Sequence, residues 1–286
     1  MYKKSVICVV KAVKRIDQIY CRMESVGDVN KLYYLFSNTL GFPEAWPPKD
    51  RKTYYGGGVY TGNTWLKWTT PNLKSYPMTN KPARFSSIQA EPTEYNRSLK
   101  EIERRGLTHD ADSVSTSEDS SRQEREWCRS SRITDTPFKE IGLSLCKYSP
   151  FAFTEHTSTP EAVDLHEHYS ILRTRLDEVE GGPLGVRYVK EVELGVKNVG
   201  ESMADWSVLL DPIKPIGEDT WKIGTGPTLR LTLDKENSIK SISVRVRSLR
   251  KARRFLKMNG LLGEERDGVV TLHRGEVNIL DIRFVK

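Results

Sequence analysis

The stretch Ser87–Leu107, SIQAEPTEYNRSLKEIERRGL, returns without a gap as Ser241–Leu261, SISVRVRSLRKARRFLKMNGL. Ile102 falls on Leu256, and the glycine near the end of one copy falls on the glycine of the other. Each copy predicts a short strand, then an amphipathic helix, then a glycine that ends the helix. Because a strand–helix unit recurs at long range, the chain is predicted to be built from modules.

Length and composition are typical of a soluble globular protein. The chain has 286 residues, of which 37% are hydrophobic and 29% are charged. No apolar run approaches the roughly 18 residues that a membrane span needs, so no membrane association is expected. The length suits two domains with separate cores. The four cysteines are scattered without a C-x-x-C pair, which predicts a reducing, cytoplasmic location and no disulfide framework.

The positive charge does not by itself predict a nucleic-acid partner. The net charge is +7, and its densest run, Arg245–Lys257, passes from a predicted strand into a helix whose other face is apolar. No helix-turn-helix, zinc-finger or RNP-like pattern accompanies the run. A solvated helix face therefore explains the charge better than a nucleic-acid footprint.

Further internal sequence matches extend the repeat to the whole chain. Gly62–Trp68 matches Gly142–Tyr148, because both read glycine, four residues, lysine and an aromatic residue. Val189–Val192 lies at a constant offset from Ile16–Ile19, and both segments have the alternation of a strand. Between the copies, the polar tract 108–131 is rich in serine and lacks apolar residues to bury, which predicts a mobile loop or insertion.

These matches predict an α+β protein of four βαβββ modules in two pairs. The predicted parts are a first domain 1–155 with modules about 14–71 and 83–150, a linker helix within 156–183, and a second domain 184–286 with modules about 186–236 and 237–286.

Two stretches mark the ends of this pattern: residues 16–43 read IDQIYCRMESVGDVNKLYYLFSNTLGFP, and residues 242–263 read ISVRVRSLRKARRFLKMNGLLG. Together they resemble the vicinal oxygen chelate superfamily. That superfamily includes glyoxalase I, bleomycin-resistance proteins and extradiol dioxygenases. The resemblance implies two glyoxalase-like domains with cupped mixed sheets and helices on the outer face. It also implies a divalent metal in a cup, held by His, Gln or Glu on the first strand of each module and by Glu on the last strand.

The residues at those positions argue against the implied metal site. The first-strand positions hold Gln18, Ser87, Glu191 and Ser241. The last-strand positions hold Leu66 or Lys67, Cys146 or Lys147, Arg230, and Ile279 or Asp281. A lysine ammonium has no lone pair to give and repels a dication, so no metal cofactor is expected, and one divalent metal ion is the alternative. Of the histidines, His109 falls in the polar tract and His273 in a turn, while the linker histidines His156, His166 and His168 are predicted to face solvent.

Strand alternation predicts the contents of each cup. In the first domain the candidate ligand-binding residues are Gln18, Tyr20, Arg22, Trp65, Lys67, Trp68, Ser87, Gln89 and Tyr148. Cationic groups beside aromatic rings suit an organic acid or a planar anion. The alternative is that these polar groups satisfy one another and fill the cup. In the second domain the inward residues Glu191, Glu193, Arg230, Ser241, Ser243 and Arg245 predict an ion-pair network, with Glu191 as a weaker candidate for a general base.

Three hypotheses about function follow. The first is a protein that binds a small organic, anionic or aromatic ligand in the first cup without the usual metal. The second is a glyoxalase-like lyase or isomerase, or an extradiol-dioxygenase-like oxygenase, with an altered site around Gln18 or Glu191. The third is a structural or partner-binding role without catalysis, in which the repeats also fit a homodimer.

Overall fold

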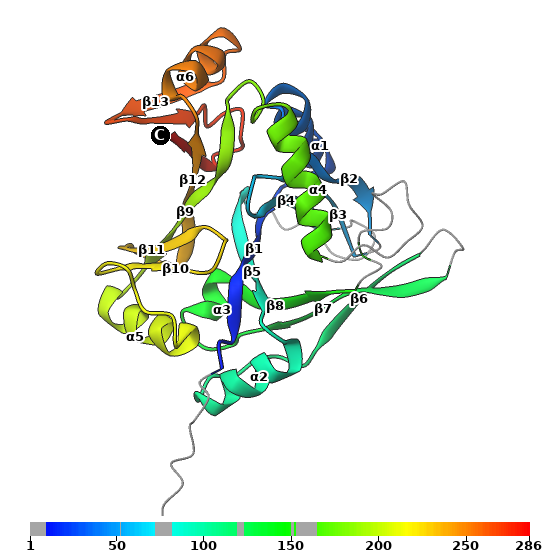
Figure 1. The fold of residues 1–286 in the computed structure, drawn as a ribbon, viewed down its shortest axis with the longest axis vertical. Coiled ribbons are helices and arrows are strands. Elements are labelled where there is room, and N and C mark those ends of the chain that lie inside the picture. Colours follow the sequence, from blue (N-terminus) through cyan, green and yellow to red (C-terminus); the bar gives the residue numbers. More distant parts are fainter. Residues whose placement is uncertain (1–9, 52, 72–81, 119–122, 150–151, 153–164) are drawn as a thin grey trace, which may run out of the picture.

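The structure is a computed structural model that describes residues 10–51, 53–71, 82–118, 123–149, 152 and 165–286. It contains two mixed β-sheets with helices, the α+β architecture that the repeats predict (Figure 1). None of the helices in these residues has the length and apolar character needed to cross a membrane.

The first sheet is built from two successive modules. The first module consists of β1 (Val13–Arg22), α1 (Val26–Tyr34), the π-helical turn η1 (Leu35–Thr39), β2 (Glu44–Asp50), β3 (Tyr54–Tyr60) and β4 (Trp65–Pro71). The second consists of β5 (Arg84–Pro92), α2 (Tyr95–Arg104), β6 (Ser113–Glu118), β7 (Glu124–Arg132), α3 (Phe138–Ile141) and β8 (Leu143–Tyr148). The strand order is β2-β3-β4-β1-β5-β8-β7-β6, so the first strands of the two modules pair, antiparallel, at the centre.

The second sheet repeats this plan after the helix α4 (Leu165–Glu178), which falls inside the predicted linker. Its third module consists of β9 (Val186–Val196), α5 (Val199–Leu210), β10 (Thr220–Lys222) and β11 (Thr228–Leu233). Its fourth module consists of β12 (Ser238–Val246), α6 (Leu249–Met258), β13 (Leu262–Arg266), β14 (Val269–Leu272) and β15 (Asp281–Val285). The order β10-β11-β9-β12-β15-β14-β13 again places two first strands side by side. The third module has one strand fewer than its counterparts, and the proline-containing segment 211–217 stands where that strand would be.

The helix ends predicted from the repeat are confirmed. α2 and α6 stop before Gly106 and Gly260, whose φ angles are +80° and +69°. In both copies the N–H of the residue after the glycine donates to the carbonyl five residues earlier, at 3.1 and 2.8 Å. Glycine fits because this left-handed backbone conformation disfavours residues with a Cβ.

The polar tract 108–131 is not the loop that its composition predicts. It contains β6 and most of β7, which pair as an antiparallel hairpin, and β7 pairs in turn with β8 (Figure 1). Residues 119–122 of the tract lie outside the described part of the chain. Pairing along an existing sheet edge satisfies the backbone of this segment without a large apolar face, which a composition argument does not detect.

The two sheets are held together at the turn between β3 and β4. Asn63 exchanges two hydrogen bonds of 3.0 Å with the backbone of Val189 on β9. Beside it, Gly62 has φ +96°, and a Cβ built on it would lie 2.0 Å from the carbonyl oxygen of Arg187. Only glycine permits this approach of the second sheet to the first.

Candidate functional site: the cup of the first sheet

The alternation of β1 divides the first sheet into two faces. The register pairs of β1 with β4 are Gln18 with Trp65, Tyr20 with Lys67, and Arg22 with Thr69. The face that carries these residues is called the first cup below, and the opposite face packs on helices. Ile19 and Cys21 alternate with these residues and are fully buried on the helix side.

A hydrogen-bonded chain of polar side chains closes the floor of the first cup. The Gln18 amide donates to the Tyr148 hydroxyl, which donates to Gln89 Oε1 at 3.2 Å. Tyr20 donates to the same oxygen at 3.0 Å. Gln18 is fully buried and, with Tyr148, forms the floor beneath the open part of the cup, while Gln18 Oε1 has no hydrogen-bond partner among the described residues.

Above that floor the cup remains open. A cavity of about 530 Å³ lies between β1, β4, β5 and the β6–β7 hairpin. Its lining includes Tyr20, Arg22, Tyr54, Gln89, Trp127 and Cys128. This volume is in the range of pockets for small organic molecules.

Lys67 lies on the cup face, buried behind the cavity wall with 3% of its surface exposed. Its Nζ donates to the Tyr54 hydroxyl at 3.0 Å and lies 4.8 Å from the centroid of that ring. It also lies 5.1 Å from the centroids of both Tyr20 and Trp127, and 5.5 Å from that of Trp46. No carboxylate among the described residues pairs with it. Cation–π attraction offsets part of the cost of burying this ammonium group.

Arg22 supplies a second positive charge, directly in the cavity lining. Its guanidinium has no hydrogen-bond or ion-pair partner within the described part of the chain. The first cup therefore has two cationic side chains next to aromatic rings, and the part of the chain that the structure describes supplies no acidic counterpart to either.

Two predicted tryptophans do not reach the cavity. Trp65 is on the cup face, where the Tyr169 ring of α4 stacks on it with centroids 4.5 Å apart. Trp68 lies on the other face, against Phe36, with ring centroids 4.9 Å apart. Both are predicted to contribute to the cup, but the register places only Trp65 on the cup face.

Ser87, which is predicted to line the cup, pairs with Tyr20 and so shares its face, but the cavity lining includes its neighbour Ser86 and not Ser87. The register of β1 with β5 shifts between Tyr20 and Cys21, so two β5 residues fall opposite one step of β1. Ser86 is the extra residue at this bulge, and its position beside the cavity is not anticipated by simple alternation.

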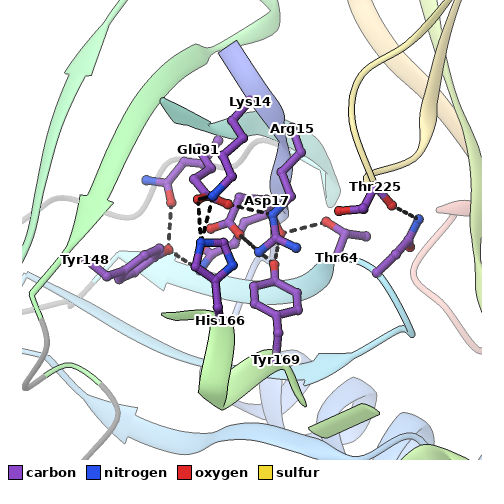
Figure 2. Close-up of polar contacts among 12 residues, drawn as sticks. Lys14, Arg15, Asp17, Thr64, Glu91, Tyr148, His166, Tyr169 and Thr225 are labelled. Atoms are coloured by element: carbon purple, nitrogen blue, oxygen red, sulfur yellow. Dashed lines mark hydrogen bonds and ion pairs between the residues drawn. The ribbon is translucent and has the colours of Figure 1, made fainter. Parts of the chain in front are cut away.

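α4 joins the end of the first cup to a buried charged cluster (Figure 2). Tyr169 donates to Asp17 Oδ1 at 2.5 Å, and Arg15 bridges Asp17 at 3.3 Å and Glu91 at 2.7 Å. Burial raises the pKa of Asp17 to about 6, although the Arg15 charge and the Tyr169 hydrogen bond oppose this rise. Asp17 Oδ2 has no hydrogen-bond partner among the described residues.

The linker histidines only partly follow the prediction that they face solvent. His168 on α4 is 2% exposed, with its ring 5.8 Å from that of Trp65, because the helix turns it toward the sheet. His166 keeps 59% of its side chain exposed and lies 2.7 Å from Lys14 Nζ. His109 is 15% exposed, His273 is exposed in a turn, and His156 lies outside the described residues.

The second sheet forms the ion pairs expected of it. Glu191 pairs with Arg230 at 2.9 Å, while Glu193 contacts Arg230 at 3.3 Å and Arg283 at 2.5 Å. Burial favours the protonated form of Glu193, but a hydrogen bond from Ser241 and the two guanidinium groups outweigh it and lower its pKa. The Glu191 carboxylate is bound to a cation, which opposes its candidate role as a general base.

Comparisons with known proteins agree on the fold. No family model and no curated protein matches the chain. A hypothetical protein from Staphylococcus aureus superposes with a TM-score of 0.59 at 8% identity, over 94% of this chain and 98% of its own. A variant of homoprotocatechuate 2,3-dioxygenase from B. fuscum has a TM-score of 0.60 at 8% identity, over 97% and 72%. The substrate complex of that enzyme with 3,4-dihydroxyphenylacetate has a TM-score of 0.57 at 8% identity, over 97% and 82%.

The chain therefore shares its fold with homoprotocatechuate 2,3-dioxygenase, in agreement with the fold that the resemblance to the vicinal oxygen chelate superfamily predicts. At the positions that the superfamily resemblance assigns to metal ligands, the side chains have other partners. Gln18 donates its amide to Tyr148, Glu191 pairs with Arg230, and Lys67 places an ammonium in the first cup. Within the described residues no group of three or more His, Cys, Asp or Glu side chains is placed to hold a metal ion. The donors present do not fit the divalent metal implied by the resemblance.

Several cavity residues were not predicted from the sequence, chiefly Tyr54, Ser86, Trp127 and Cys128. Trp127 and Cys128 lie on β7, inside the polar tract whose composition predicts a loop. A tryptophan in an otherwise serine-rich, charged segment is the signal that could have identified them, because such a ring seldom remains in solvent without a partner.

Proposed function

We propose that the chain binds a small organic anion with a planar or aromatic body in the first cup. The observation that carries this proposal is the pair of cationic side chains, Arg22 and Lys67, beside a cavity of about 530 Å³, with no carboxylate among the described residues to neutralise either one. Two like charges on one wall repel each other, and an anionic ligand relieves that repulsion.

Each wall of the cavity has a separate part in this proposal. Arg22 presents a planar fork of donors to the cavity, which suits the two oxygens of a carboxylate. Tyr54 and Trp127 offer ring faces and edges against which a planar body can pack. Gln89, with its oxygen held by Tyr20 and Tyr148, adds a polar group of fixed orientation at the base.

The structural neighbour that binds 3,4-dihydroxyphenylacetate supports this ligand class by analogy of fold. That molecule has one carboxylate and one aromatic ring, the two features for which the first cup offers partners. It is therefore a suitable probe, and phenylacetate is a second probe without the ring hydroxyls.

The test is to titrate the full chain with each probe and to measure binding by calorimetry and by quenching of tryptophan fluorescence. Fluorescence is suitable because Trp127 lines the cavity. Arg22→Ala removes a charge-assisted pair worth about 1.5–3 kcal/mol, so affinity is expected to fall at least about tenfold. Arg22→Lys keeps the charge and is expected to recover part of the loss.

Lys147→Ala is the matched control. Lys147 is an exposed cation on β8 of the same sheet, and it alternates with Tyr148, so its side chain points away from the first cup. This variant should bind both probes as the wild type does. Equal affinities of the Arg22→Ala and Lys147→Ala variants, or no binding of either probe by the wild type at millimolar concentration, would contradict the proposal.

A further inference from the structure

Two cysteines lie diagonally opposite each other on the cup face of β7 and β8. The register pairs Cys128 with Tyr148 and Ser130 with Cys146. Directly paired residues share a face, and the Tyr148 hydroxyl joins the hydrogen-bonded floor of the first cup, so both thiols point into the same cup. Both are free and buried.

The surroundings make the two thiols chemically different. The neighbouring Cys146 thiol, the Lys67 charge and the Ser115 hydroxyl lower the pKa of Cys128, although burial opposes this effect. Burial and the neighbouring Cys128 raise the pKa of Cys146. Hydrogen-bond donation and a nearby cation stabilise a thiolate.

The two thiols also differ in access. Cys128 lines the cavity, whereas Cys146 stands behind it with 1% of its surface exposed. A small reagent that enters the first cup therefore meets Cys128 first, with a second thiol in contact behind it. An accessible thiolate beside a second thiol is the arrangement typical of redox-sensitive cysteine pairs.

We propose that Cys128 and Cys146 form a peroxide-reactive thiol pair, in which Cys128 is the attacking thiolate and Cys146 the resolving thiol. This inference concerns the cup wall and does not depend on the ligand proposed above.

The reaction requires a hydroperoxide as the oxidant. The Cys128 thiolate attacks one peroxide oxygen, the O–O bond breaks, and the leaving oxygen takes a proton and departs as water or an alcohol. Cys128 is thereby oxidised by two electrons to a sulfenic acid, and the peroxide is reduced. The Cys146 thiol then loses its proton and attacks the Cys128 sulfur. An S–S bond forms, the S–O bond breaks, and hydroxide leaves with that proton as water.

The experiment treats the reduced full chain with hydrogen peroxide, blocks the remaining thiols and maps tryptic peptides by mass spectrometry. Cleavage after Arg129 or Lys139 separates the two cysteines, so a disulfide joins two peptides and lowers the mass by that of two hydrogen atoms. The wild type is expected to show this linkage, and Cys146→Ser is expected to accumulate a dimedone-reactive sulfenic acid on Cys128.

Cys21 provides the internal control, because it is fully buried on the helix face and burial raises its pKa. At neutral pH, Cys128 of the wild type should be alkylated at least about tenfold faster than Cys21, a comparison that requires no substitution and no refolding. Cys21→Ser should form the linkage as the wild type does. Equal alkylation rates of Cys128 and Cys21, or peroxide treatment that leaves Cys128 a free thiol, would overturn the proposal.

Discussion

The Tyr169 ring of α4 stacks on the Trp65 indole of β4, with ring centroids 4.5 Å apart and an interplanar angle of 19°. The same tyrosine donates its hydroxyl to Asp17 on β1. One residue of the connecting helix thus covers the end of the first cup and supplies a partner to a buried carboxylate. This packing explains why the helix belongs to the core of the first sheet and does not act as a simple tether.

The two contacts of Tyr169 can be separated by mutation. Tyr169→Phe keeps the stacking but leaves Asp17 without its hydroxyl donor, so the free energy of unfolding should fall by about 1–3 kcal/mol. Tyr169→Ala also opens a cavity against Trp65, and the loss should reach about 3–5 kcal/mol. Urea denaturation measures both values. Equal losses in the two variants would show that the stacking contributes nothing.

Asp17 should make stability depend on pH. Its pKa is about 6 in the folded chain and roughly 4 in the unfolded chain, so the folded state binds more protons between these values. The contribution of this group to stability is therefore present at low pH and is lost as pH rises through that window, by up to about 3 kcal/mol.

The Asp17→Asn variant lacks this titration. The difference in unfolding free energy, variant minus wild type, should rise by about 2–3 kcal/mol between pH 4 and pH 7. Chemical denaturation at several pH values measures it, and other carboxyl groups cancel in the difference. Parallel pH profiles for the two proteins would refute this assignment.

Lys67 is a buried cation with aromatic neighbours and no acidic partner among the described residues. Lys67→Met keeps the length and removes the desolvated charge, so the free energy of unfolding should rise by about 1 kcal/mol. Affinity for 3,4-dihydroxyphenylacetate should fall at the same time. The exposed Lys147→Met is the control and should change neither quantity; a Lys67→Met protein that is less stable and binds the anion unchanged would contradict this account of the first cup.

Gly62 should tolerate no side chain. It shares a positive φ with Gly106, but a Cβ on Gly62 meets the Arg187 carbonyl at 2.0 Å, whereas one on Gly106 meets nothing within 4 Å. Gly106→Ala should cost about 1 kcal/mol of stability, the strain of the backbone alone. Gly62→Ala should cost at least about 3 kcal/mol, because it also separates the two sheets. Thermal unfolding compares them, and equal costs would show that the contact with Arg187 is readily relieved.

Much of the architecture follows from patterns that are local in the chain. The spacing of apolar residues, the glycine after each helix and the repeat of Ser87–Leu107 at Ser241–Leu261 predict the modules, because helix and strand periods and left-handed helix ends depend on short stretches. The same alternation placed Tyr20, Arg22 and Lys67 on one face of the first sheet. In the second sheet it placed Glu191 and Arg230 on one face, where they form an ion pair.

Contacts between distant segments decided the rest. A bulge in the pairing of β1 with β5 placed Ser86 beside the cavity, and the folding of a polar tract onto β8 brought Trp127 and Cys128 into its lining. The docking of α4 placed Tyr169 over Trp65. The sequence by itself determined which residues share a face. Which of those residues remain open to a ligand was decided by the tertiary structure, because that depends on which segments, remote in the chain, pack over the face.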